Sequence, residues 1–204
     1  MDTTENRAKI VRGELINAAV FATMWGFSEV VLGTILNSAR IPFRSIIMSF
    51  IGAVLLISAK PFNPSRGSLI LIGAVTATLK LFISAGFNVT PFAAILLESL
   101  IAELIFSISG YNRVSSIIAG VLILIYTLLH ALLMQSFFLG IEIFRVYYKM
   151  ALKFAEPIGL TNTIVDYIVA SIPIIYIIAG LLAGITGWRL GNKIKNSMRS
   201  KNEN

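Results

Sequence analysis

Five ionisable side chains lie inside long apolar runs of this 204-residue sequence. An ionisable group in hydrocarbon costs several kcal/mol, so it indicates either a functional site or a partner within the protein. The five are Glu29, Lys80, Glu98, Glu103 and His130. Carboxylates can bind a cation or carry a proton, and an imidazole can donate and accept hydrogen bonds.

Aromatic residues accompany two of these groups at helical spacing. Trp25 precedes Glu29 by four residues, and Tyr126 precedes His130 by four, so each pair shares a helix face. An indole beside an acid and a phenol beside an imidazole suit a small polar ligand with an aromatic ring. We therefore predict a ligand-binding set: Trp25, Glu29, Lys80, Glu98, Tyr126 and His130.

Each member also has a purely structural interpretation. Lys80 can form a buried ion pair with Glu98 or, instead, with Glu29. Trp25 and His130 can be ordinary packing residues. Glu103 can form a hydrogen bond with another helix, face a partner protein or contact the ligand.

The elements that position these residues follow from composition. The chain is 56% hydrophobic and 13% charged, whereas a soluble domain carries about 25% charged residues. A membrane-spanning helix needs about 20 mostly apolar residues. Six stretches qualify, separated by short breaks with Pro, Gly, Asn or Arg: 14–37, 41–59, 67–86, 91–109, 114–141 and 164–188. We predict an all-α polytopic membrane protein, a single six-helix bundle over 1–204.

The longest connection has its own pattern. Charged residues recur at helical spacing from Glu142 to Lys153, with apolar residues on another face. This predicts an amphipathic segment over 142–156 that lies at the interface or extends the fifth helix past a bend near Gly140.

The net charge of +7 comes from Lys and Arg that flank the apolar runs. Their bias places both termini in the cytoplasm, with Lys60 counted among the inside positives, and a cell membrane as the location. In this setting the basic tail from Arg189 to Lys201 indicates contact with membrane lipid rather than with nucleic acid.

Small residues at four-residue spacing form two further patterns. Ala18 and Ala22 lie in the first helix, and Gly180 and Gly184 lie in the sixth. Such spacing lets helices approach closely, either within the bundle or against a partner. For Ala18 and Ala22 we predict a partner interface, with internal packing as the alternative.

Catalytic and cofactor patterns are missing from the sequence. It has no cysteine, one histidine, no GxSxG, no HExxH and no Walker A loop. We therefore expect no enzyme activity, no metal site and no cofactor. Any ATP that drives transport must be used by another chain.

The sequence resembles the substrate-binding (S) components of energy-coupling factor (ECF) transporters. The shared features are the length, the six helices, the inside termini, the basic tail and the Ala18–Ala22 pair. Many members of that family carry an AxxxA motif in helix 1. The resemblance implies capture of a vitamin-like nutrient or a metal ion from outside. It also implies docking on a membrane coupling subunit through helices 1 to 3, and tipping driven by two cytoplasmic ATPases.

Thiamine binders of that family use an acid in helix 4 and a histidine in helix 5. Glu98 and His130 lie in the corresponding helices predicted for this sequence. Those proteins are rich in tryptophan near the ligand, whereas this chain offers only Trp25 there, which leaves the ligand unassigned.

Two other functions fit the same residues. A proton-coupled transporter that works alone would use Glu103 as a proton relay. A structural or assembly subunit would pair its polar groups with one another and bind no nutrient.

Overall fold

The computed structural model describes residues 3–39, 44–83, 89–140, 148, 152 and 162–202. Within these ranges the chain is made of helices and turns and has no strand, so the all-α prediction is confirmed there. The helices are α1 (Thr3–Ser38), α2 (Arg44–Ala59), the short 3-10 helix η1 (Lys60–Phe62), α3 (Ser68–Ile83), α4 (Val89–Ser109), α5 (Arg113–Leu139) and α7 (Asn162–Asn202). The predicted amphipathic segment 142–156 lies outside the described residues, apart from Tyr148 and Leu152, which are helical.

Most of these helices have the length and apolarity of membrane spans. In the described ranges, α1, α2 with η1, α4, α5 and α7 each contain a span long and apolar enough to cross a bilayer. Helix α3 is equally apolar but has only 16 described residues. The chain is a multi-pass membrane protein.

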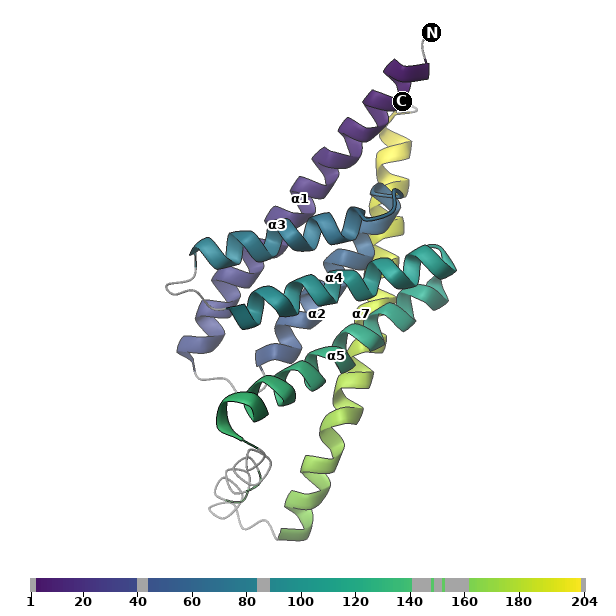
Figure 1. The fold of residues 1–204 in the computed structure, drawn as a ribbon. Coiled ribbons are helices and arrows are strands. Elements are labelled where there is room, and N and C mark those ends of the chain that lie inside the picture. The colour runs from purple at the N-terminus through teal and green to yellow at the C-terminus, as the bar shows by residue number, and fades with distance from the viewer. Residues whose placement is uncertain are drawn as a thin grey trace.

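The helices run back and forth along the bundle, and both termini emerge at the same end (Figure 1). We call this end the terminal side and the opposite end the far side. Helices α3 and α4 lie side by side, and α7 crosses both α5 and α2.

Two helices are longer than the sequence predicted. Helix α1 begins at Thr3 rather than at residue 14, and α7 continues to Asn202 rather than ending at 188. The predicted ranges are membrane-spanning stretches, and an apolar run shows where a helix leaves lipid, not where its hydrogen bonds stop. The flanking residues include Ala, Arg, Lys and Glu, which favour helix, and no proline interrupts them.

The glycines of α7 pack inside the bundle. A Cβ atom on Gly120 of α5 would lie 2.4 Å from the carbonyl oxygen of Gly180, and one on Gly184 would lie 2.6 Å from the Cα of Ile117. Only glycine permits this approach of two backbones. The GxxxG pattern therefore joins α5 to α7.

Candidate functional site

A carboxyl group and two hydroxyl groups from three helices meet in the far half of the bundle. The hydroxyl of Ser49 in α2 donates to Glu98 Oε1 in α4 at 2.5 Å. Thr127 Oγ1 in α5 lies 3.0 Å from the same oxygen and 2.8 Å from Ser49 Oγ. Glu98 is only 4% exposed. We call Ser49, Glu98 and Thr127 the Glu98 cluster.

The contacts of Glu98 are all to hydroxyl groups. Both bonds fall on Oε1, and no donor from the described residues reaches Oε2. No described lysine or arginine lies within ion-pair distance of Glu98, although the charges of Glu29 and Lys80 act on it from further away. Glu98 is thus a buried acid without a contacting cation in the described part of the chain.

Trp25 packs beside this cluster. Its indole is fully buried, and a Cβ atom on Gly52 of α2 would lie 2.8 Å from Trp25 Nε1. Gly52 follows Ser49 by three residues, so the ring lies over the same face of α2 that supplies the hydroxyl. Trp25 Nε1 has no hydrogen-bond partner among the described residues.

Tyr126 and His130 form the predicted pair on α5. The phenol oxygen lies 3.0 Å from His130 Nδ1, and the ring centroids are 5.4 Å apart. His130 follows Thr127 by three residues, which places it one helical turn from the Glu98 cluster. Its other nitrogen, Nε2, is buried and has no partner within the described ranges.

Lys80 pairs with Glu29 and not with Glu98. Lys80 Nζ lies 2.5 Å from Glu29 Oε2 and donates to the Glu29 carbonyl oxygen at 3.0 Å. Of the two pairings that the sequence left open, the structure selects the one between α1 and α3. Lys80 is therefore not the counter-ion of Glu98.

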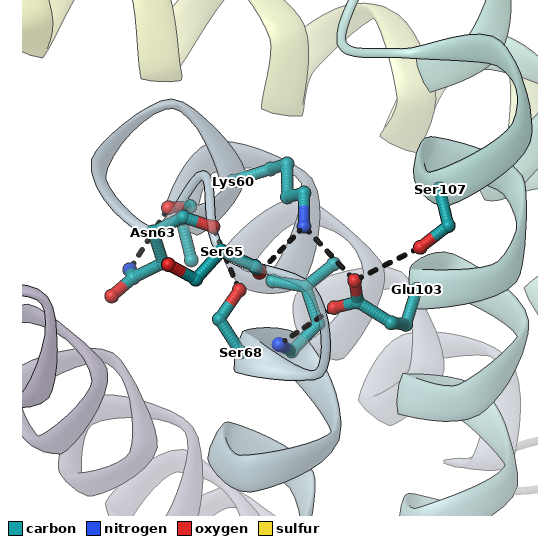
Figure 2. Close-up of polar contacts among 8 residues, drawn as sticks. Lys60, Asn63, Ser65, Ser68, Glu103 and Ser107 are labelled. Carbon is teal, nitrogen blue, oxygen red and sulfur yellow. Dashed lines mark hydrogen bonds and ion pairs between the residues drawn. The ribbon is translucent and has the colours of Figure 1, made fainter.

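A second ion pair, Lys60 with Glu103, is buried between η1 and α4 (Figure 2). Lys60 Nζ lies 3.0 Å from Glu103 Oε1 and 3.2 Å from the carbonyl oxygen of Ser65. The amide of Leu69, in the first turn of α3, donates to Glu103 Oε2 at 2.9 Å, and Ser107 donates to Oε1 at 3.2 Å. Glu103 thus joins α4 to η1 and to the start of α3. We call Lys60, Ser65, Leu69, Glu103 and Ser107 the Glu103 cluster.

The turn between η1 and α3 is held by further bonds in the same view. Ser68 donates to the Asn63 carbonyl oxygen at 2.7 Å, and Asn63 Nδ2 donates to the Ala59 carbonyl oxygen at 3.0 Å (Figure 2). Lys60 is only 6% exposed. Lys60, which was counted among the inside positives, is therefore buried and paired inside the bundle.

Ala18 and Ala22 are covered within the chain. They are 4% and 0% exposed, and Thr76 of α3 donates to the Ala22 carbonyl oxygen at 3.1 Å. Ala22 is covered by α3, whereas Ala18 lies at the edge of a groove between α1 and α3 that Leu71 and Val75 also line. The outward face of α1 instead forms an open groove of about 470 Å³, lined by Ala19, Val20, Thr23, Met24 and Phe27.

Sequence reasoning missed Ser49, Lys60 and Thr127. Hydroxyl residues are common in membrane helices, where they often bond their own backbone, as Thr127 also does with the Ile123 carbonyl oxygen at 3.0 Å. The available signals were the three-residue spacings of Ser49 to Gly52 and of Thr127 to His130. The sequence placed Lys60 at a helix end beside Pro61, where its pairing with Glu103 could not be seen.

The class defined by fold and site is a multi-pass membrane protein whose described helices hold a buried acid without a contacting cation, a buried ion pair and a part-buried ion pair. In the described ranges no group of three or more metal-ligating side chains comes together. No known protein family, curated protein or solved structure matches the chain.

Proposed function

We propose that this chain is the membrane-embedded substrate-binding component of an ECF-type transporter. It captures a small vitamin-like nutrient at the Glu98 cluster, from the outer side of the cell membrane. A transmembrane coupling subunit and cytoplasmic ATPases, which are separate chains, supply the energy. In this proposal the terminal side faces the cytoplasm, so the Glu98 cluster lies in the outer half of the bundle.

The observation that carries the proposal is the unsatisfied polar chemistry around Glu98. A buried polar group without a partner costs free energy, so each such group in a folded protein needs an explanation. Two such atoms are Trp25 Nε1, which packs against Gly52 one turn from Ser49, and His130 Nε2, one turn from Thr127. Glu98 Oε2 also accepts no bond from a described donor. A ligand that satisfies them would be held by a charge, by hydrogen bonds and by an aromatic face.

The site is closed in this structure. Glu98 and Trp25 are buried among the helices that carry them, and the open grooves line α1 instead. Ligand entry therefore requires α2, α4 and α5 to separate on the far side. The hydroxyls of Ser49 and Thr127 close the cluster through bonds that such a movement would break.

Native mass spectrometry tests the binding function. The protein is purified gently from cells grown in rich medium, and any released small molecule is identified. We expect a stoichiometric nutrient on the wild type and binding weakened by about 10- to 100-fold in Glu98→Gln, the loss expected for a hydrogen bond to a charged group. Ser28→Ala is the control, because Ser28 bonds only its own helix at the Met24 carbonyl oxygen.

Uptake assays test the energy source. Cells that express this chain with an ECF coupling subunit and its ATPases should accumulate the identified molecule, and cells without the ATPases should not. A protein that stays empty after incubation with a panel of vitamins and metal ions would contradict the proposal.

A proton-coupled carrier that works alone is the second candidate, favoured by the unpaired acid. Glu98, rather than Glu103, would then carry the proton, because Glu103 is bound to Lys60 and to the Leu69 amide. This candidate predicts uptake into vesicles that contain this chain alone and a proton gradient. It also predicts loss of that uptake in Glu98→Gln.

A further inference from the structure

We propose that the ligand is a monocation, and that Glu98 exchanges one proton for its positive charge. This inference rests on the proposed function only in taking the Glu98 cluster as the binding site. It names the substrate class and adds an exchange that the binding function alone does not require.

The first observation is the charge balance of the bundle. Lys80 is matched by Glu29 at 2.5 Å, and Lys60 is matched by Glu103 at 3.0 Å. Each pair is closed by further bonds, from Lys80 to the Glu29 carbonyl oxygen and from the Leu69 amide to Glu103. The buried charges of the described helices therefore cancel, apart from that of Glu98.

The second observation is the set of groups that surround Glu98. A lone carboxylate inside a membrane protein is strongly disfavoured, so the empty site holds a proton instead. Ser49 donates to Oε1, and the Thr127 hydroxyl, whose single proton can go to Oε1, to Ser49 Oγ or to the Ile123 carbonyl oxygen, also lies within bonding distance of Oε1. Oε2, which no described donor reaches, is the oxygen left open for the proton and for a cationic ligand.

The neighbouring groups do not supply an alternative charge. Glu29 and Lys80 lie on α1 and α3 and form an ion pair with each other. Helix α5 offers Tyr126 and His130, which bond each other, and α2 offers only the Ser49 hydroxyl. On α4 itself, Glu103 is paired with Lys60. Binding one positive charge at Oε2 and releasing one proton keeps the site neutral throughout.

Infrared spectroscopy in lipid vesicles tests the empty state. We expect a carbonyl stretch of a protonated carboxyl group in the wild type that Glu98→Gln removes. Glu14→Gln is the control and should keep it. Thr127→Val should shift the frequency of the same band, because a hydrogen bond to Oε1 is lost, and this assigns the band without removing Glu98. A wild type without the band overturns the inference.

Two probes of the same shape test the exchange. N-methylpyridinium is a monocation, and toluene is its neutral counterpart. The cation should replace the carboxyl band with carboxylate bands and release about one proton per molecule bound, measured with a pH-indicator dye. Because proton and cation compete, its affinity should fall about tenfold for each pH unit below the titration of Glu98. Toluene should do neither.

The outcomes separate the two proposals. A band that neither probe changes, or that both change equally, overturns the exchange. If a nutrient is found on the purified protein but the band is absent, the inference fails and the proposed function stands. If the band responds to the cation but ATP-driven uptake is never seen, the proposed function fails and the exchange stands.

Discussion

Lys80 of α3 reaches across the bundle to Glu29 of α1 and leaves Glu98 of α4 without a cation. Lys80 Nζ lies 2.5 Å from Glu29 Oε2, and the two side chains are 17% and 8% exposed. Lys80 also bonds the Glu29 carbonyl oxygen. This arrangement makes the pair a tie between two helices and makes Glu98 the acid available for chemistry.

A double-mutant cycle tests that tie. Glu29→Gln or Lys80→Met alone should destabilise the protein by about 3 kcal/mol, because each leaves an unpaired buried charge. The double variant Glu29→Gln/Lys80→Met should recover much of that loss. Thermal unfolding in detergent measures the three variants. Strictly additive losses would show that the two side chains do not interact.

Removing the hydroxyl groups around Glu98 should weaken the site. Thr127→Val removes one bond to Glu98 Oε1 and the link to Ser49, and we expect a loss of ligand affinity of about tenfold. Titration calorimetry with the identified nutrient measures it. Thr78→Val is the matched control, since Thr78 is exposed and bonds only the Ala74 carbonyl oxygen. Equal affinity in both variants would show that Thr127 does not contribute to ligand binding.

Glu103→Gln should loosen the start of α3 rather than the ligand site. The substitution leaves Lys60 buried without its counter-ion, which costs about 3 kcal/mol or more. It also weakens the acceptor of the Leu69 amide. Hydrogen exchange should rise at Leu69 and the residues that follow it. Ser107→Ala removes a single bond to Glu103 and should have a much smaller effect.

Transport assays on Glu103→Gln distinguish this structural role from a proton relay. A structural role predicts less folded protein but normal pH dependence of the remaining uptake. A relay predicts that uptake loses its dependence on the proton gradient.

Glycine packing between α5 and α7 gives a test with an internal control. Gly184→Ala places a Cβ 2.6 Å from the Ile117 Cα and from the Ser116 carbonyl oxygen, so two backbones must separate. We expect a loss of about 1–3 kcal/mol in the free energy of unfolding. Gly13→Ala, where no atom lies within 4 Å, should be neutral or stabilising by up to about 1 kcal/mol. A stable Gly184→Ala protein would contradict the close approach.

The buried phenol of Tyr111, in the turn before α5, should limit the stability of the protein at alkaline pH. Burial raises the pKa of Tyr111 from 10.0 to about 12. The folded state therefore keeps the phenol proton that the unfolded chain loses above pH 10, and stability should fall as pH rises from 10.0 to about 12. Unfolding midpoints of wild type and Tyr111→Phe across this range measure it, and the wild type should fall more steeply. Parallel curves would show that Tyr111 does not titrate differently on folding.

The membrane class and the helices could be read from the sequence alone. Mostly apolar runs of about the length that a bilayer requires leave few alternatives, because an unpaired backbone in lipid is too costly. The pair of Tyr126 and His130 was also accessible, since residues four apart on one helix meet whatever the rest of the fold does. The helix ends in water could not be predicted from apolar runs, because α1 and α7 continue beyond their apolar parts.

Tertiary structure alone decided which charges meet. The sequence allowed Lys80 to pair with Glu29 or Glu98 and gave no indication that Lys60 is buried with Glu103. Contacts between helices depend on how each one rotates about its axis and on its depth in the bundle, and glycines such as Gly52 and Gly184 set both through close approach. The hydroxyls of Ser49 and Thr127 became visible as partners of Glu98 only once three separate helices were brought together.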